Sequence, residues 1–196
     1  MITNRLVLRE WVPSDRVSFA EMNADPRVMR YFPAPLTRKE SNALVDHVEA
    51  HFEKHGFGPW AVEIPGVTEF AGFIGLSVPN FVAHFTPCVE IGWRLAVEHW
   101  GQGYATEGAS AVLDYAFNSL QLHEVVSFTT KENLPSRRVM ERIGMVYDES
   151  SDFDHPNLPE GHPLRPHVLY RKLNRNESQC VETHAKITAT TTKESQ

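Results

Sequence analysis

The 196-residue sequence predicts an α+β fold, with a mixed, mostly antiparallel sheet of about seven strands flanked by about four helices. Three observations lead to this prediction. Strand-like and helix-like segments interleave along the chain, three strand-like segments follow one another between residues 60 and 95, and single helices separate the later strands. Helices interleaved with a mostly antiparallel sheet form layered α+β domains. The length suits one such domain.

The composition points to a globular protein of the cytoplasm. Hydrophobic residues make up 41% and charged residues 22% of the chain. We expect no membrane association, because no apolar run is long enough to cross a bilayer and the N-terminus lacks a secretory signal. Cys88 lies in a strand-like run and Cys180 in a polar tail, so we expect no structural disulfide. The formal net charge of -6 argues against nucleic acid as a partner.

The first segments predict a strand followed by two helices. Residues 5–11 contain apolar residues broken by arginines and indicate a first strand. Ser14 is then placed to cap a helix that Asp25 and Pro26 either end or bend. Residues 31–36 hold two prolines and cannot be regular structure, yet they are too apolar for an ordinary surface loop. They either pack under the next helix or line a pocket.

The second helix opens with Thr37 and Glu40, which have the spacing of a capping box. His47, His51 and His55 recur every four residues and so form one row on this helix. Histidines four apart can bind zinc, but no carboxylate or cysteine partner is evident. We therefore favour a solvated polar stripe and expect no metal.

Three neighbouring strands are predicted at residues 60–64, 70–78 and 88–95. They are close enough in sequence to pair as antiparallel neighbours. Gly72 and Gly75 lie inside the second of these strands, where glycine indicates a bulge or a close approach of another backbone segment.

A loop with two glycines follows the third of these strands and leads directly into a helix. Gly101 and Gly103 remove side chains from the turn, so backbone N–H groups can point into one small space. The new helix adds unpaired N–H groups and the positive end of its dipole. This arrangement suits a phosphate, although glycines in an ordinary strand-to-helix turn would look the same in isolation.

The remaining elements alternate strand and helix. A helix at residues 105–120 precedes a strand at 124–129, and Asn133 caps a short helix that Gly144 ends. A strand begins at Met145, a polar proline-rich segment covers residues 148–163, and the last strand covers 166–173. We assign residues 1–173 to one domain and Asn174–Gln196 to a disordered tail, which lacks apolar periodicity.

Two motifs in order and at matching spacing resemble the GNAT superfamily of acyl-CoA-dependent N-acetyltransferases. The first is Glu90-Ile91-Gly92-Trp93 through Trp100-Gly101-Gln102-Gly103-Tyr104-Ala105-Thr106-Glu107. The second is Asn133-x-x-Ser136 followed by Glu141-Arg142-x-Gly144-Met145. The likeness spans about residues 3–173, and its nearest branch is the ribosomal-protein N-terminal (alanine/serine) acetyltransferases.

The resemblance implies acetyl-CoA as co-substrate and an amine as acceptor. It places the pantetheine arm between the diverging fourth and fifth strands, against the backbone of Leu95 and Val97, with Asn133 beside it. Arg137 or Arg138 would reach a phosphate, or these arginines are surface charges only. Backbone N–H groups would hold the pyrophosphate, namely those of Gln102, Gly103, Tyr104, Ala105 and Thr106.

Three residues are the candidate catalytic groups. Glu90 would act as the base, or it is a structural carboxylate paired with Arg94. Ser136 would protonate the leaving thiolate, and Asn133 would bind the pantetheine or help to orient it. The sequence departs from the family at two positions: Met140 stands where many members have a tyrosine, and Trp100 stands where the glycine motif usually begins with Gln or Arg.

The sequence indicates the acceptor pocket less clearly than the acetyl-CoA site, because no motif marks it. Phe32, Trp60, Phe73 and Glu90 are its candidate lining residues. Residues 152–167 form either a flap over the acceptor or a plain surface loop; their histidines and carboxylates are too irregular for a metal site. The leading acceptor is a protein N-terminal α-amine. A small amine, such as a polyamine or an aminoglycoside-like compound, and a non-catalytic acyl-CoA sensor are the alternatives. We expect a monomer or a homodimer.

Overall fold

The computed structural model describes residues 1–174 and contains one mixed sheet in the order β1-β2-β3-β4-β5-β8-β6, with β7 on β8. All neighbouring strands are antiparallel except β4 and β5, which are parallel. The strands are β1 (Val7–Arg9), β2 (Pro59–Ile64), β3 (Thr68–Ser77), β4 (Glu90–Leu95), β5 (Glu124–Thr130), β6 (Val146–Tyr147), β7 (Phe153–Asp154) and β8 (Pro166–Leu173). The predicted α+β class and the mostly antiparallel sheet are confirmed.

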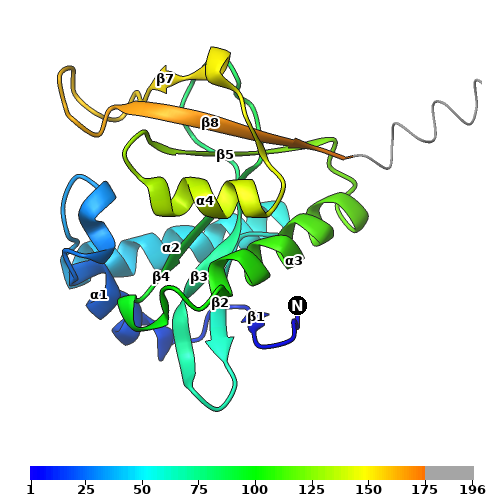
Figure 1. Ribbon diagram of the computed structural model, residues 1–196. Helices are drawn as coiled ribbons and strands as arrows, with labels where there is room; N and C mark the ends of the chain where they lie inside the picture. Colours follow the sequence, from blue (N-terminus) through cyan, green and yellow to red (C-terminus); the bar gives the residue numbers. More distant parts are fainter. Residues whose placement is uncertain (175–196) are drawn as a thin grey trace, which may run out of the picture.

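The helices lie on both faces of this sheet (Figure 1). They are α1 (Asp15–Ala24), α2 (Arg38–His55), α3 (Tyr104–Asn118) and α4 (Leu134–Arg142), with short 3-10 turns η1 (Val28–Tyr31), η2 (Val97–His99) and η3 (Glu149–Ser151). Apolar residues of α3 and α4 join one core on one face, and those of α1 and α2 join a second core on the other. Among the helices of residues 1–174, none combines the length and hydropathy needed to cross a bilayer.

The parallel strands β4 and β5 pair at one position and then diverge. Glu90 is the Cα partner of Val126, and no later residue of β4 has a partner in β5. One residue further along, the Ser127 hydroxyl donates to Ile91 O at 2.8 Å, which closes the narrow end of the gap. In Figure 1, β5 and β8 run across the direction of β2, β3 and β4. The backbone of β4 beyond Ile91 therefore faces an opening between two strands.

A third, smaller core lies on the α1/α2 face of the sheet, over β5 and β8. Val126 and Leu169 are buried there with Phe85. Their strand neighbours Val125 and Val168 belong instead to the large core under α3 and α4, because successive residues of a strand point to opposite faces. The other aromatic rings of this third core are Phe81 from the loop after β3, Phe128 from β5 and Phe153 from β7.

Several local expectations are confirmed and others are wrong. The Thr37–Glu40 capping box is present. Ser14 occupies the N-cap of α1, but its side chain makes no capping hydrogen bond. The segment at 148–163 contains the short strand β7, which pairs with β8. Asn174 is buried and its amide donates to Phe117 O and Leu122 O, so the folded part includes this residue. The rest of the predicted tail, with Cys180, lies outside the described residues.

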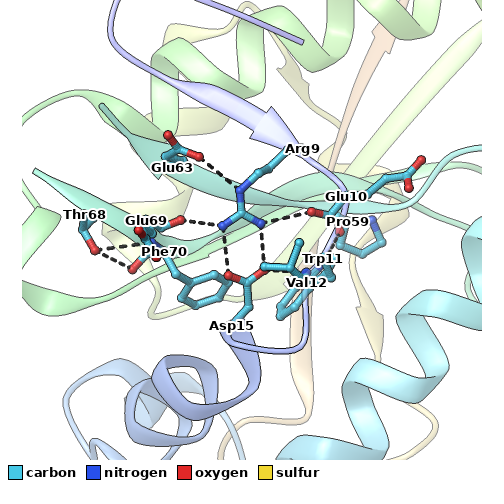
Figure 2. A network of polar contacts seen from close by, with 10 residues as sticks. All are labelled: Arg9, Glu10, Trp11, Val12, Asp15, Pro59, Glu63, Thr68, Glu69 and Phe70. Atoms are coloured by element: carbon cyan, nitrogen blue, oxygen red, sulfur yellow. Dashed lines mark hydrogen bonds and ion pairs between the residues drawn. The ribbon is translucent and has the colours of Figure 1, made fainter. Parts of the chain in front are cut away.

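The start of α1 is held instead by an ion pair between the half-buried Arg9 and the buried Asp15 (Figure 2). Both Nη atoms of Arg9 donate to Asp15, at 2.8 and 2.9 Å, and Asp15 also accepts from Val12 N at 2.9 Å. Arg9 Nε donates to Glu63 at 3.2 Å, and Nη2 donates to Glu69 O at 2.7 Å. One guanidinium thus joins β1, β2, β3 and the first turn of α1.

Replacing Arg9 with methionine should destabilise the fold by about 3–5 kcal/mol, because it leaves the buried Asp15 carboxylate without its counter-ion. Arg16→Met is the matched control. Arg16 also joins α1 to its neighbour, but its partners Asp46 and Glu49 are 67% and 49% exposed, so about 1 kcal/mol or less is expected. Urea unfolding measures both changes. Equal losses in the two variants would contradict the role given to Arg9.

Candidate functional site

The loop between β4 and α3 has the backbone geometry of an anion site. Gly101 and Gly103 have φ angles of +73° and +84°, which favour glycine over residues with a Cβ. The first backbone hydrogen bond of α3 runs from Glu107 N to Gly103 O at 3.0 Å. The N–H groups of Tyr104, Ala105 and Thr106 precede it and therefore have no acceptor within the helix. Together with the helix dipole they favour a bound anion.

Arg5 lies against this loop, a contact that the sequence did not indicate. Its Nη1 donates to Gln102 O at 3.0 Å, and its guanidinium lies 4.7 Å from the centre of the Tyr104 ring. Nη2 forms an ion pair with Glu107 at 2.6 Å. Thr3 Oγ1 donates to the same carboxylate at 2.7 Å. The N-terminal segment thus ties the loop to the first turn of α3 and places a cation beside it.

Trp100, at the start of the glycine loop, donates two hydrogen bonds to the chain at and just after the end of β4. Its indole Nε1 donates to Leu95 O at 2.8 Å, and its backbone N–H donates to Val97 O at 3.1 Å. Leu95 and Val97 are the residues predicted to pair with pantetheine. Each carbonyl oxygen retains a second lone pair. The tryptophan therefore fastens the loop back onto the end of β4.

The start of α4 places Asn133 and Ser136 near the end of β5. Asn133 is the N-cap of α4: its Oδ1 accepts from Ser136 N at 3.3 Å, and its Nδ2 donates to Thr129 Oγ1 at 2.9 Å. Ser136 is half-buried in the first turn of the helix. Met140 lies one turn later and is 1% exposed within the large core. Met140 has no proton to donate, so the hydroxyl nearest to it along α4 is that of Ser136.

Arg137 and Tyr170 form a polar cluster on the same helix. Arg137 Nε donates to the Tyr170 hydroxyl at 3.2 Å, and Nη1 donates to Lys131 O at 3.2 Å. The Tyr170 hydroxyl in turn donates to Glu141 at 3.1 Å. The hydrogen bond from Arg137 to Tyr170 raises the pKa of the guanidinium. Arg137 is thus held by β8, and its contact with a phosphate stays a prediction.

Glu90 stands at the narrow end of the opening between β4 and β5. Ser77 Oγ donates to its carboxylate at 3.3 Å, and burial raises the pKa of Glu90 to about 8. Arg94, the partner considered from the sequence, forms no ion pair with it. Gly92 lies between them on the same face of β4, and a Cβ there would meet only Glu90 Oε1, at 3.9 Å. The strand is therefore bare beside the carboxylate.

Arg94 lies at the other end of this face, among aromatic rings. Its guanidinium carbon is 4.0 Å from the centre of the Phe32 ring and 5.5 Å from that of Phe73. Nη1 donates to Oδ1 of the buried Asn23 at 2.6 Å. Within the segment at residues 31–36, Phe32 thus covers Arg94, whereas Leu36 packs against the core of α1 and α2. The second contact matches the alternative in which the segment packs under the next helix, and a pocket stays a prediction.

Trp60 is not brought together with Phe32 and Phe73. It is buried in the large core, with its ring centre 5.6 Å from that of Phe52 and 5.4 Å from that of Tyr115. The candidate acceptor residues therefore divide into two groups. Phe32, Phe73 and Glu90 share the face covered by α1 and α2, and Trp60 lies apart.

The proline-rich segment at 152–167 packs on the face that carries Glu90. Phe153 lies 5.6 Å from Phe128 and 4.8 Å from Phe85, measured between ring centres. His155 and His167 are 4.9 Å apart, and burial lowers the pKa of both. This wall of neutral rings adjoins Val126, the β5 partner of Glu90.

His51 is part of the core and does not belong to a solvated stripe, which corrects the sequence interpretation. Its Nδ1 lies 2.8 Å from Phe57 O, and its Nε2 accepts from Val78 N at 3.0 Å. These two contacts require a neutral ring that is protonated on Nδ1, and burial lowers its pKa. Within residues 1–174, no three potential metal ligands of the His, Cys, Asp or Glu type lie together.

Comparisons with known proteins agree with this geometry. Residues 5–146 match the family model described as an acetyltransferase (GNAT) domain. The uncharacterized protein YkkB of Bacillus subtilis (strain 168) is 33% identical over 151 residues, which are 76% of this chain and 87% of that protein. The FsC-acetyl coenzyme A-N(2)-transacetylase of Aspergillus fumigatus is 35% identical over 72% of this chain and 64% of that protein.

Solved structures share the same fold. An acetyltransferase from Agrobacterium tumefaciens str. C58 has a TM-score of 0.70 and 30% identity over 88% of this chain and 92% of its own. A ribosomal-protein-S5-alanine acetyltransferase from Vibrio fischeri has a TM-score of 0.68 over 89% of this chain and 96% of its own. The sequence identity is 20%, so this likeness shows the fold alone. The diverging strands, the glycine loop before α3 and the family match agree, and the chain belongs to the GNAT family of acetyl-CoA-dependent N-acetyltransferases.

Proposed function

We propose that this chain acetylates a primary amine, with Glu90 as the base, and that the leading acceptor is the α-amine of a protein N-terminus. One observation carries the proposal. A carboxylate with a pKa raised to about 8 stands beside bare strand at Gly92, where β4 and β5 begin to separate. A base with a pKa near the working pH is best suited to accept a proton from an attacking amine.

The described residues fit acetyl-CoA. When bound, acetyl-CoA supplies the thioester carbonyl that the amine attacks. The N–H groups of residues 102–106, with Arg5 behind them, would hold the pyrophosphate, because they have no helical acceptors and lie at a helix N-terminus. The backbone of Leu95, at the end of β4, and of Val97, in η2, would hold the pantetheine arm, because β5 does not pair with β4 beyond Glu90.

The protein's part in the reaction is small and local. An α-amine has a pKa of about 8, so Glu90 needs to remove a proton only from the charged fraction. Most of the rate would come from holding the amine against the carbonyl. Ser136 would donate a proton to the departing sulfur, since Met140 cannot, and Asn133 positions Ser136 through its backbone N–H.

A small amine is the second candidate acceptor. A relative at 35% identity is named FsC-acetyl coenzyme A-N(2)-transacetylase, and that name does not specify a protein N-terminus as the acceptor. The third possibility, an acyl-CoA sensor, would bind CoA and acetylate nothing. A panel of N-terminal peptides and small amines, read by thiol release and by mass spectrometry, separates the three. Tight CoA binding without product on any acceptor would contradict the proposal.

Gly103→Glu should weaken acetyl-CoA binding more than about tenfold, since a carboxylate would oppose the pyrophosphate. Gly66→Glu is the matched control. Gly66 has a similar φ of +76° and open space in the turn between β2 and β3, so it carries the same backbone strain away from the loop. Calorimetric titration measures both affinities, and thermal melting confirms folding. Normal affinity in Gly103→Glu would remove the loop from the site.

Glu90→Gln should lower kcat by about 100-fold and abolish the rise of wild-type activity toward pH 8.

The pH dependence of the melting temperature tests the raised pKa of Glu90 independently of catalysis. The folded pKa of about 8 exceeds the ordinary 4.5, so Glu90 contributes stability that is lost as pH rises from about 4.5 through 8. The melting temperature of Glu90→Gln relative to wild type should therefore increase from pH 5 to pH 9. An unchanged rate profile would exclude Glu90 as the base.

Ser136→Ala should lower kcat by about 100-fold and leave the KM for acetyl-CoA nearly unchanged, because the hydroxyl acts on the leaving sulfur. The capping contact survives, since it uses the Ser136 backbone N–H. Ser110→Ala, at an exposed position of α3, is the control for loss of a helical serine. Steady-state kinetics decide the matter, and wild-type turnover in Ser136→Ala would mean that water is the acid.

A further inference from the structure

Arg94 is a cation without a counter-ion in the part of the chain that the structure describes. Burial lowers its pKa to about 10, which still leaves it charged at neutral pH, and no carboxylate forms an ion pair with it. Its Nε is buried and has no hydrogen-bond acceptor among residues 1–174. Within the same residues its hydrogen-bond partner is Asn23, which is neutral. Such a charge is costly unless something neutralises it.

The surroundings of Arg94 belong to the acceptor side of the site. Glu90, Gly92 and Arg94 alternate along β4 and point to one face, and their β3 partners are Ser77, Gly75 and Phe73. Phe32, 37% exposed, covers the guanidinium from the segment between η1 and α2.

The spacing sets where an anion on the acceptor would lie. Glu90 and Arg94 are four residues apart, which places their Cα atoms about 13 Å apart along the strand. Glu90 faces an incoming amine, so Arg94 faces a group several bonds further along the same molecule. An α-carboxylate next to the reacting amine is too close to reach it. A polyamine would place a second ammonium beside the guanidinium, and the two like charges would repel.

We infer that Arg94 selects acceptors that carry a carboxylate several bonds away from the reacting amine. This inference rests on the proposed function of the same site. The planar guanidinium suits a carboxylate, to which it donates charge-assisted hydrogen bonds. Two sources supply this chemistry: an acidic residue that follows a protein N-terminus, and a free amino acid with an amine on its side chain.

Arg94 also has a structural contact, which the test must separate from recognition. Asn23 Oδ1 accepts a hydrogen bond from Arg94, and Asn23 Nδ2 donates one to Oγ of the buried Ser41 at 2.9 Å. Arg94 therefore helps to join α1 and α2 to the sheet. Asn23→Asp separates the two roles. It keeps the shape and the contact with Arg94 and supplies an internal carboxylate that neutralises the guanidinium.

The experiment compares kcat/KM for matched acceptors in the full chain. One arm uses peptides identical except for Glu or Gln at the second or third residue. The other arm uses lysine against lysinamide and cadaverine. In wild type, kcat/KM should be about tenfold or more higher for the acceptors that carry a carboxylate. A factor of this size corresponds to one hydrogen bond between charged groups. Preference in the peptide arm assigns the carboxylate to a protein, and preference in the amino-acid arm alone assigns it to a small molecule.

Arg94→Gln and Asn23→Asp should both bring this preference close to one, whereas Arg16→Gln, the control on α1, should leave it unchanged. Asn23→Asp decides the matter if Arg94→Gln fails to fold. Equal rates for both members of each pair in wild type, or an unchanged preference in Asn23→Asp, would overturn the inference and leave the proposed function standing. No product with any acceptor would overturn both.

Discussion

The separation of β4 from β5 is the constraint on which the rest of the site depends. The two strands share one paired position, Glu90 with Val126, and the Ser127 hydroxyl then closes the gap at Ile91 O. Beyond this point the backbone groups of β4 have no β5 partner. Unpaired backbone groups inside a protein are costly, so an opening of this kind calls for a ligand or water to satisfy them. The parallel direction of the two strands puts the glycine loop and the cap of α4 at the same edge.

The opening has two sides with different chemistry. On the α3 and α4 side lie N–H donors, the cation of Arg5 and the cap formed by Asn133, all of which suit an anionic, amide-rich donor molecule. On the α1 and α2 side lie Glu90, bare Gly92 and Arg94 among aromatic rings. Donor and acceptor would thus approach β4 from opposite faces and meet near Glu90, the proposed base.

The acceptor face also shows how binding and folding share the same contacts. Arg94 and Asn23 help to hold α1 and α2, yet the guanidinium retains an unmatched charge. A folding contact alone would be met as well by an apolar residue of similar volume. The unmatched charge of Arg94 lowers the stability of the fold. A carboxylate on a bound acceptor would neutralise this charge and offset the loss.

The backbone geometry of the glycine loop and of the α4 cap could be predicted from the sequence because neighbouring residues encode it. Gly101 and Gly103, the Asn133 cap and the strand and helix periods are local features, set by φ angles, capping and burial of one face. The resemblance to the GNAT family added the expectation that the glycine motif and the Asn133 motif belong to one site. Contacts between distant segments have no such signal, and Arg5 against Gln102 and Glu107 is the clearest example.

The sequence by itself determined the fold class, through the order of its strand and helix patterns, and the glycine loop, through a short run of residues. Its choice of Glu90 as the base stays a prediction. Only the tertiary structure decided that Trp60 packs in the core, that His51 is a neutral buried ring, and that Glu90 and Arg94 do not pair. The physical reason is the same in each case. The environment of these side chains is made by elements far apart in the chain, and burial changes what a charge or a ring can do.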